Sequence, residues 1–222
     1  RDAWAYNFSK NAVTSNMQRM IAFYNEQQKD FALAKQKNSK LNIEEFIDTD
    51  ETQISWTVNL KKDLEKGVNH CFRGSELKIG LYRPFTKENL YFDKPFIERP
   101  GLSSQLFPNP ELENLVINVT GTGASKPFSL LISSLITNLD SIEKGQCFPL
   151  YYYEERKKQT LSLFDDNSKG NYIRRDGVSD FILERAKKQY GKNVAKEDIF
   201  YYVYGFLHSP EYRETFAADL RK

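Results

Sequence analysis

The sequence predicts an α+β fold with a central mixed or antiparallel sheet, a long N-terminal helix and a C-terminal helical subdomain. Apolar residues recur at helical spacing near the start of the chain. Short runs rich in β-branched and aromatic residues, separated by Pro and Gly, follow through the middle. The end of the chain returns to helical spacing. We therefore expect a helix-plus-sheet region over residues 1–155 and a helical subdomain over residues 156–222.

The composition is that of a globular protein with a nearly balanced charge. Its 222 residues are 40% hydrophobic and 28% charged, which supplies a core for one large domain or two small ones. The formal net charge of +2 does not indicate nucleic-acid binding by itself. Any such surface requires a local concentration of Lys and Arg.

The cysteines and the apolar runs limit the classes of protein. Cys71 and Cys147 lie far apart with no CxxC pair, so neither a zinc ribbon nor a disulfide framework is indicated, and a reducing, cytoplasmic location is favoured. No apolar run is long enough to cross a bilayer, so no membrane partner is expected. The chain starts at Arg1 rather than Met, and we expect it to be a fragment of a larger polypeptide.

A long helix is predicted from Lys10 to the mid-30s, with Ser9 as its N-cap. Its apolar residues recur at three- and four-residue spacing, the pattern of one buried face. They are Val13, Met17, Met20, Ile21 and Tyr24. A Met and aromatic stripe of this kind indicates core, or the seam to a neighbouring domain, rather than a cofactor site.

The next segment mixes acidic and alternating patterns. The acidic run Glu44–Glu51 is compatible with a short helix and with a loop. Residues 53–60 alternate apolar and polar side chains, which predicts a half-buried strand. A short helix is expected among the lysines that follow it.

Residues 77–101 combine short β-prone runs, strand-breaking Pro and Gly residues, and positive charge. We expect two strands joined by a connection of several residues that includes Thr86–Asn89. Pro84 should end the first strand, or make it an edge, at Arg83. The basic residues near the connections suit phosphate contact, although ordinary solvated loop charge explains them as well. They are Arg83, Lys87, Lys94 and Arg99.

Several short strands are predicted between residues 102 and 153. Residues 102–109 form a loop or one helical turn, 115–119 a strand, 128–139 a strand pair or strand-turn, and 147–153 a further strand. The run GTGASKPFS at 121–129 is not a P-loop, because Lys126 has no Gly before it and Pro127 after it. Its small residues can still bring backbone N–H groups close to a DNA backbone. Residues 154–175 are polar and loop-like, and a subdomain boundary is expected there.

Three helices are predicted in the tail. Ser179 can cap the first and Gly191 can end it. In the second helix, apolar residues occupy every position of the i, i+3, i+4, i+7, i+8 pattern. In the third, apolar residues recur every four positions. The apolar positions of the second are Ile199, Tyr202, Val203, Phe206 and Leu207, and those of the third are Tyr212, Phe216 and Leu220. We expect this tail to form a helical cap packed on the sheet.

No catalytic constellation is apparent. Only His70 and His208 are available as histidine acid–base groups. His208 at a helix end is explained by the helix dipole, and His70 with Cys71 makes a poor metal site because no partner pair accompanies them. Nothing in the sequence requires an enzyme.

Several stretches resemble the C-terminal specificity domain of Type ISP restriction-modification enzymes. They are RDAWAYNFS at 1–9, MQRMIAFYNEQ at 17–27, YRPFTKENLYFD at 82–93, QCFPLYYYE at 146–154 and KEDIFYYVYGFLHSPEYRETFAADLRK at 196–222. The resemblance implies a bacterial polypeptide with a nuclease, a helicase-like ATPase, an adenine N6-methyltransferase and, last, a target recognition domain. It implies that this fragment is the non-catalytic recognition domain, with double-stranded DNA and the methyltransferase and helicase domains as partners. S-adenosylmethionine, ATP and Mg²⁺ would then belong to the parts outside it.

The resemblance and the basic loops together predict a DNA-contacting surface. Lys and Arg would position the module on phosphates, and loop side chains would read base edges in the major groove. We expect Arg and Asn to read bases and Lys126 with Thr122 to contact phosphates, while the methyltransferase flips the target adenine. The candidate residues are Arg73, Arg83, Lys87, Asn89, Arg99, Thr122, Ser125 and Lys126.

The main alternative is a docking module with little DNA contact of its own, using the helix at 10–35 and the helical tail. A concentrated positive face would favour DNA recognition, and a large exposed apolar face would favour docking. A free-standing nuclease is a third interpretation, but it requires an acidic metal cluster that the sequence does not supply.

Overall fold

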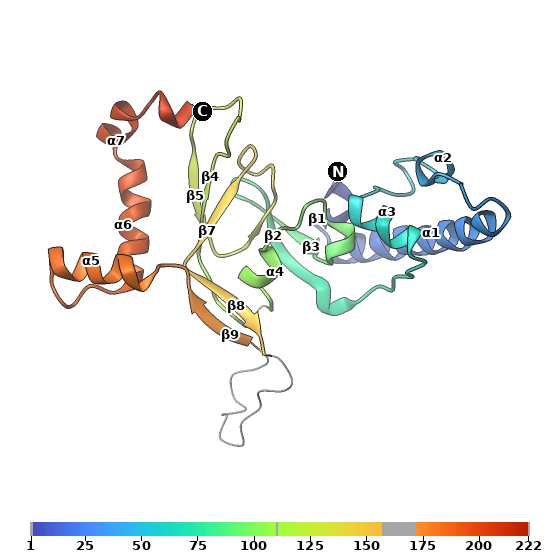
Figure 1. Ribbon diagram of the computed structural model, residues 1–222, viewed down its shortest axis with the longest axis horizontal. Coiled ribbons are helices and arrows are strands. Elements are labelled where there is room, and N and C mark those ends of the chain that lie inside the picture. The colour runs from blue at the N-terminus through green and yellow to red at the C-terminus, as the bar shows by residue number, and fades with distance from the viewer. Residues whose placement is uncertain (1, 110, 157–171, 222) are drawn as a thin grey trace, which may run out of the picture. The chain divides into compact units, whose positions relative to one another are not determined.

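The computed structural model describes residues 2–109, 111–156 and 172–221. It confirms the α+β class, with a long N-terminal helix, strands in the middle and helices at the end (Figure 1). The chain divides into two compact units, unit 1 with residues 1–80 and 86–101 and unit 2 with residues 81–85 and 102–222. The boundary expected at 155–156 falls within unit 2 and stays a prediction.

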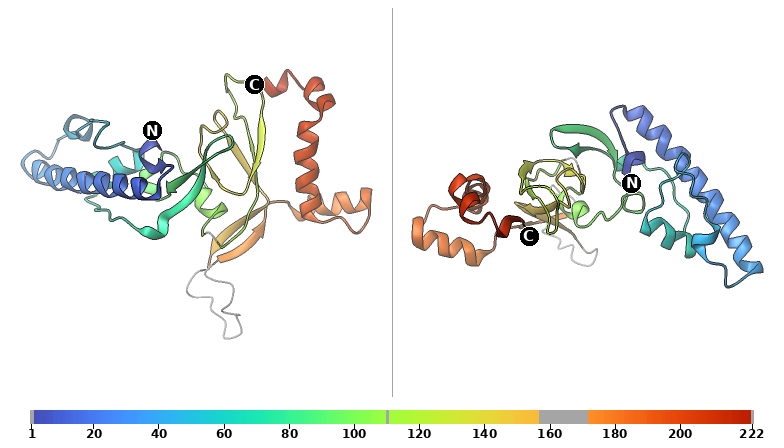
Figure 2. Two further views of the ribbon diagram at one scale, coloured as in Figure 1. Left: turned by 180° about the vertical axis from the view of Figure 1, so that it is seen from behind. Right: turned by 90° about the horizontal axis from the view of Figure 1, so that it is seen from above.

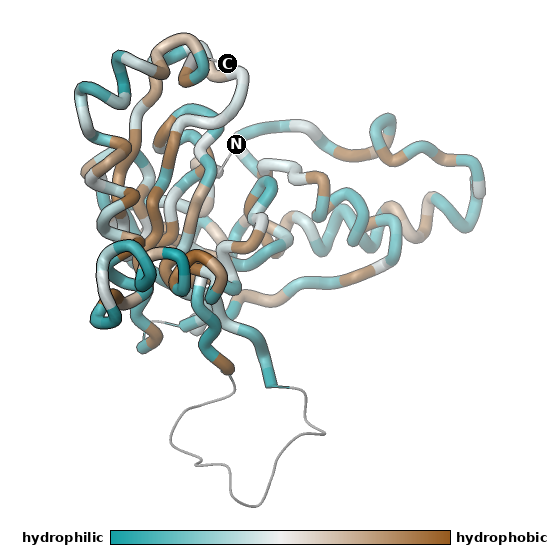
Figure 3. Tube along the Cα trace, turned by 60° about the vertical axis from the view of Figure 1, so that its left-hand side comes forward, coloured by the Kyte–Doolittle hydropathy of each residue, from teal (hydrophilic) through white to brown (hydrophobic). Residues whose placement is uncertain are grey.

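Unit 1 is built on α1 (Lys10–Lys37), as predicted. The Ser9 hydroxyl accepts a hydrogen bond from the Ala12 N–H at 3.3 Å and so caps the helix. The predicted apolar face is buried and extends through Gln28 to Phe31. In the hydropathy view, hydrophilic stretches predominate along this helix and are interrupted by shorter hydrophobic ones (Figure 3). The 3-10 helix η1 (Asp2–Ala5) and the short strand β1 (Tyr6–Asn7) precede it.

The strand predicted at 53–60 is wrong. After α2 (Ile43–Phe46), helix α3 occupies Val58–Glu65, and Thr57 caps it by accepting a bond from the Leu60 N–H at 3.0 Å. Helix α3 buries Leu60 and Leu64, four residues apart, and Ile54 and Thr57 are buried in the non-helical segment before it. Alternating hydropathy hid this pattern because Val58 is exposed and Thr57 is buried.

The two central strands exist, but their connection is shorter than predicted. Strand β2 covers Leu77–Arg83 and β3 covers Thr86–Tyr91, so only Pro84 and Phe85 lie between them. The polar Thr86–Asn89 stretch is part of β3, which lies between β1 and β2 in the sheet; β1 pairs antiparallel with the end of β3, with Asn7 opposite Asn89 and Tyr6 opposite Leu90. The sheet order is β1-β3-β2-β6. The 3-10 helices η2 (Gly74–Glu76) and η3 (Lys94–Phe96) flank the two strands in the chain.

Unit 2 contains a three-stranded sheet in the order β5-β4-β7. The helix α4 (Ser103–Leu106) leads into β4 (Val116–Val119), which pairs antiparallel with β5 (Leu130–Ser133) and β7 (Gln146–Pro149). The predicted 128–139 strand-turn is present as β5 and β6 (Ile136–Thr137). The two strands do not pair with each other, because β6 lies beside β2 in the other sheet. There the Asn138 N–H donates to the Leu81 carbonyl at 3.0 Å.

The loop predicted at 154–175 is wrong at both of its ends, which belong to a two-stranded sheet. Strand β8 (Tyr151–Glu155) pairs antiparallel with β9 (Tyr172–Asp176), so the end of that segment is a strand, and residues 157–171 lie outside the described part. Polar cross-strand contacts replace the missing apolar pattern. Arg175 pairs with Glu154 at 3.1 Å, and the Arg174 guanidinium lies 4.2 Å from the Tyr151 ring centre.

The tail forms α5 (Asp180–Tyr190), α6 (Lys196–His208) and α7 (Pro210–Thr215), followed by the 3-10 turn η6 (Asp219–Arg221). Ser179 caps α5 and Gly191 ends it, as predicted. Helix α6 runs beside β5 (Figure 2). Its contacts with the sheet core come from Phe200, Tyr204 and Leu207. The predicted apolar face is therefore wrong at Tyr202, Val203 and Phe206, which are exposed, whereas Ile199 and Leu207 are half-buried.

Candidate nucleic-acid interface

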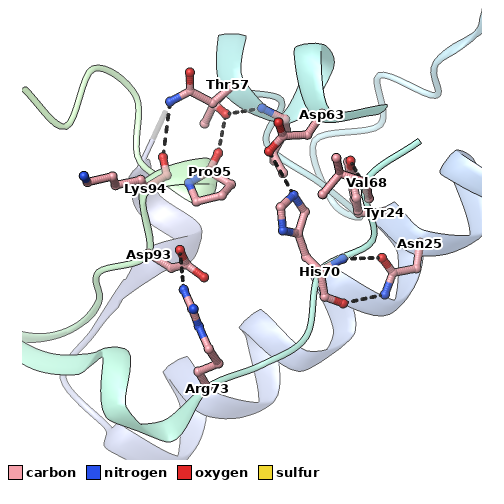
Figure 4. A network of polar contacts seen from close by, with 12 residues as sticks. Tyr24, Asn25, Thr57, Asp63, Val68, His70, Arg73, Asp93, Lys94 and Pro95 are labelled. Carbon is pink, nitrogen blue, oxygen red and sulfur yellow. Dashed lines mark hydrogen bonds and ion pairs between the residues drawn. The ribbon is translucent and has the colours of Figure 1, made fainter. Parts of the chain in front are cut away.

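A partly buried polar network holds the segment that leads into the candidate basic residues of unit 1 (Figure 4). His70 exchanges two hydrogen bonds with the Asn25 side chain, at 3.0 and 2.8 Å, and its Nε2 lies 3.1 Å from Asp63 Oδ2. The imidazole packs against the rings of Tyr24 and Phe96. His70 therefore has a structural role in unit 1, because it links Asn25 of α1 to Asp63 of α3. Among the described residues no group of three or more His, Cys, Asp and Glu is placed to hold a metal ion.

Arg73 is bound within unit 1. Its guanidinium lies 2.9 Å from the buried carboxylate of Asp93 and 3.6 Å from Glu76, and its backbone N–H donates to the Tyr91 hydroxyl at 3.1 Å. The attraction of Asp93 raises the pKa of Arg73. Burial raises the pKa of the Tyr91 hydroxyl to about 12. A DNA contact from Arg73 would compete with this ion pair, and it stays a prediction.

The other candidate residues of unit 1 differ in whether their side chains are already bound within the protein. The Asn89 amide donates to the carbonyls of Asn7 and Phe8, at 3.3 and 2.8 Å, and so ties β3 to the start of the chain. The Arg99 side chain is 78% exposed and its Nε lies 3.8 Å from Glu98. Lys87 is exposed on β3 and forms no ion pair within the described residues.

The loop after β4, residues 121–129, binds the carboxylate of Glu143 from the same chain at the place where a DNA phosphate was expected. The Ser125 and Lys126 N–H groups donate to the Glu143 carboxylate at 3.0 and 2.8 Å, and the Ser125 hydroxyl adds a bond at 3.0 Å. These bonds lower the pKa of Glu143. The backbone donors of Ser125 and Lys126 are therefore occupied, and at these two residues phosphate contact falls to side chains. Those of Thr122 and Lys126 are exposed.

Sequence reasoning missed the partner of this loop, the segment 138–145. Lys144 donates to the Gly123 carbonyl at 2.5 Å, and the Gly121 N–H donates to the Glu143 carbonyl at 3.1 Å. The signal was the run Asn138–Asp140, in which the Asn138 side chain accepts from the Asp140 N–H at 2.9 Å and forms a turn. A turn there places the residues after it beside the loop that follows β4.

The candidate residues are thus divided between the units. Unit 1 holds Arg73, Lys87, Asn89 and Arg99, and unit 2 holds Arg83, Thr122, Ser125 and Lys126. Within unit 2, the structure brings Thr122, Ser125 and Lys126 together on one loop, whereas Arg83 ends β2. The Arg83 guanidinium lies 4.2 Å from the Tyr82 ring centre and donates to the Tyr82 carbonyl at 2.9 Å.

Three solved structures similar to this chain over its whole length are DNA complexes. They include the ATP-dependent Type ISP restriction-modification enzyme LlaBIII bound to DNA (29% identity, TM-score 0.77) and a nuclease-deletion mutant of the Type ISP enzyme LlaGI with a DNA substrate mimic (31%, 0.77). A DrdV–DNA complex is also similar (29%, 0.79). The chain spans only 13%, 18% and 20% of these proteins, respectively.

A search of curated proteins found no match. None of the helices described in the structure has both the length and the apolar character needed to cross a bilayer. The family model of the Type ISP C-terminal specificity domain matches residues 1–222. The chain therefore belongs to the family of Type ISP C-terminal specificity domains.

Proposed function

We propose that this chain recognises a short DNA target sequence on behalf of a larger restriction-modification polypeptide. The observation that carries the proposal is that three solved relatives, each covering the whole chain, are DNA complexes. The proposal places the chain in the cytoplasm of a bacterium and assigns it no catalytic step of its own.

Exposed cations support contact with the duplex backbone. Arg83 and Lys87 form no ion pair within the described residues, and Lys126 projects from the loop after β4. These side chains suit phosphate contact, which sets the position of the protein on the duplex. Arg83 can instead donate two hydrogen bonds to a guanine edge in the major groove.

The chemistry belongs to the remainder of the larger polypeptide. The similar solved enzymes are five or more times longer than the part that this chain matches, because the chain covers 20% of them or less. We propose that a nuclease, a helicase-like ATPase and an adenine methyltransferase occupy that remainder, with ATP, Mg²⁺ and S-adenosylmethionine. The methyltransferase and helicase domains would be the partners of this chain.

The test is binding of the protein to random duplex DNA across a salt series, followed by selection of sequences from a randomised pool. We expect affinity that falls steeply with salt and enrichment of one short motif. Arg83→Ala and Lys126→Ala should each reduce the magnitude of the slope of log K against log salt by about 1, because each removes one phosphate contact.

Lys61→Ala is the matched control for these substitutions. It removes the same charge, but from an ammonium already paired with Glu44 at 2.6 Å, so the salt slope should not change. Absence of binding at low salt would contradict self-sufficient DNA recognition. Binding without an enriched motif would contradict target recognition.

A second candidate function, docking to another domain, is favoured by an exposed aromatic ladder, formed by Tyr202, Phe206, Tyr212 and Phe216. Successive ring centres lie 5.9, 4.7 and 4.9 Å apart. Tyr202, Phe206 and Phe216 are 62%, 45% and 44% exposed. Beside the ladder, Gly205 weakens α6, and nothing in the described structure packs within 4 Å of its would-be Cβ. Such a surface suits the close approach of a neighbouring domain.

Docking is tested by comparing hydrogen exchange of α6 in this chain alone and within the longer polypeptide. Slower exchange of residues 199–207 in the longer polypeptide would support docking, because buried amides open less often. Equal exchange in the two proteins would contradict it. The two functions can coexist, since the ladder and the exposed cations are different residues.

A further inference from the structure

Phe85 occupies an unusual position in the connection between β2 and β3. Only Pro84 and Phe85 separate Arg83, the last residue of β2, from Thr86, the first of β3. The backbone of Phe85 lies in the left-handed region, with φ at 66°. Its side chain is 86% exposed, more than any other large apolar residue in the described part of the chain.

Neither the backbone nor packing explains a phenylalanine there. A Pro followed by a residue with positive φ is the pattern of a type II turn, in which Gly or Asn is favoured at the second position. A bulky side chain at positive φ is destabilising. Burial normally compensates such strain, but this ring has almost no cover within the described structure. The ring therefore suits contact with something outside this chain.

The charges around Phe85 indicate what that contact is. Arg83 is held over the Tyr82 ring rather than by a carboxylate, and the exposed Lys87 follows two residues after Phe85. Neither cation is neutralised by an ion pair among the described residues. An apolar tip flanked by unpaired cations fits a duplex, whose stacked bases are apolar and whose backbone is anionic.

We propose that Phe85 inserts as a wedge between adjacent base pairs of the bound duplex and bends it, while Arg83 contacts a phosphate beside the opened step. This inference rests on the proposed DNA-recognition function. The wedge adds sequence preference without a base-edge hydrogen bond, because flexible pyrimidine–purine steps open more easily than others. The partner is thus a duplex with a deformable step in its target site.

The experiment uses the protein with a selected duplex carrying a fluorophore at each end, and it measures affinity, energy transfer and thermal unfolding. Phe85→Ala and Phe85→Gly should abolish the gain in energy transfer that reports bending, and should weaken binding by roughly tenfold. The salt slope should be unchanged, since no phosphate contact is lost. Phe85→Gly should also raise the unfolding midpoint, because Gly relieves the left-handed position.

Ile79→Ala is the control, because Ile79 is 47% exposed on β2 and should affect neither bending nor affinity. Bending by both Phe85 variants equal to that of the unchanged protein would overturn the wedge while leaving DNA recognition intact. Absence of DNA binding by the unchanged protein at low salt would overturn both. Phe85→Trp fluorescence that is shielded from a soluble quencher without DNA would show a protein contact instead and would overturn the wedge.

Discussion

Asn114→Asp is expected to destabilise the protein by about 4 kcal/mol at pH 7, because a buried amide uses both of its ends. The Asn114 amide nitrogen donates to the carbonyls of Leu106 and Tyr151, at 2.9 and 2.6 Å. Its oxygen accepts from the N–H groups of Leu115 and Tyr151, at 2.8 and 3.0 Å. A carboxylate keeps the two acceptor bonds but turns the two donor bonds into repulsion, at a site only 4% exposed.

The loss should depend on pH in a defined direction. Burial and the two facing carbonyl oxygens raise the pKa of the introduced carboxyl in the folded state above its unfolded value. The destabilisation is therefore full above that raised pKa and shrinks as the pH falls through it, since a protonated carboxyl can again donate one bond. Urea unfolding at pH 7 and pH 5, compared with the unchanged protein, measures both effects.

Asn109→Asp is the matched control, five positions earlier in the chain. Within the described part of the chain, only the oxygen of Asn109 is used, accepting from the N–H groups of Glu111 and Leu112 at 2.9 and 3.1 Å. A carboxylate makes the same bonds, so stability should stay within about 0.5 kcal/mol. Equal losses at the two positions would show that the amide donors of Asn114 do not matter.

Gly121→Ala is expected to destabilise unit 2 by about 3 kcal/mol or more, through a clash with backbone rather than with a flexible side chain. A Cβ on Gly121 would lie 1.9 Å from the Lys144 carbonyl oxygen and 2.8 Å from its carbon. The two loops must separate, which also breaks the Gly121 N–H bond to the Glu143 carbonyl. Denaturant unfolding gives the size of the loss, and the amide signals of Ser125 and Lys126 report release of the Glu143 carboxylate.

Gly205→Ala is the control for this substitution, because a Cβ there meets nothing within 4 Å and α6 is helical on both sides. Alanine should stabilise the helix by about 1 kcal/mol. A Gly121→Ala protein as stable as the unchanged one would mean that the two loops are not packed as described.

The elements that could be predicted are those with their own local signals. Helix α1 carries a capping serine and an apolar face of regular spacing, and α5 is bounded by Ser179 and Gly191. The segment at 53–60 was misassigned because a helix begins at Val58 after the buried N-cap Thr57, whose hydroxyl donates to the Pro95 carbonyl at 2.5 Å. That partner lies 38 residues away, so no local pattern contains it.

The same limit applies to the candidate site. Residue type and loop position were enough to find exposed cations such as Arg83 and Lys126. They could not show that Asp93, twenty positions later in the chain, neutralises Arg73, or that Glu143 accepts from the N–H groups of Ser125 and Lys126. The apolar face of α6 was misassigned because helical spacing identifies a stripe but does not say which neighbour covers it.

The interleaving of the two units along the chain restricts how such domains exchange by recombination. The chain leaves unit 1 after Gly80, supplies residues 81–85 to unit 2, and returns to unit 1 until Gly101. Any single crossover from 81 to 102 therefore joins segments of one unit that come from different parents. Transplanting unit 2 intact takes three crossovers, or replacement of the whole chain. New target preferences in this family should consequently arise by point substitution or by exchange of complete domains, rather than by shuffling halves.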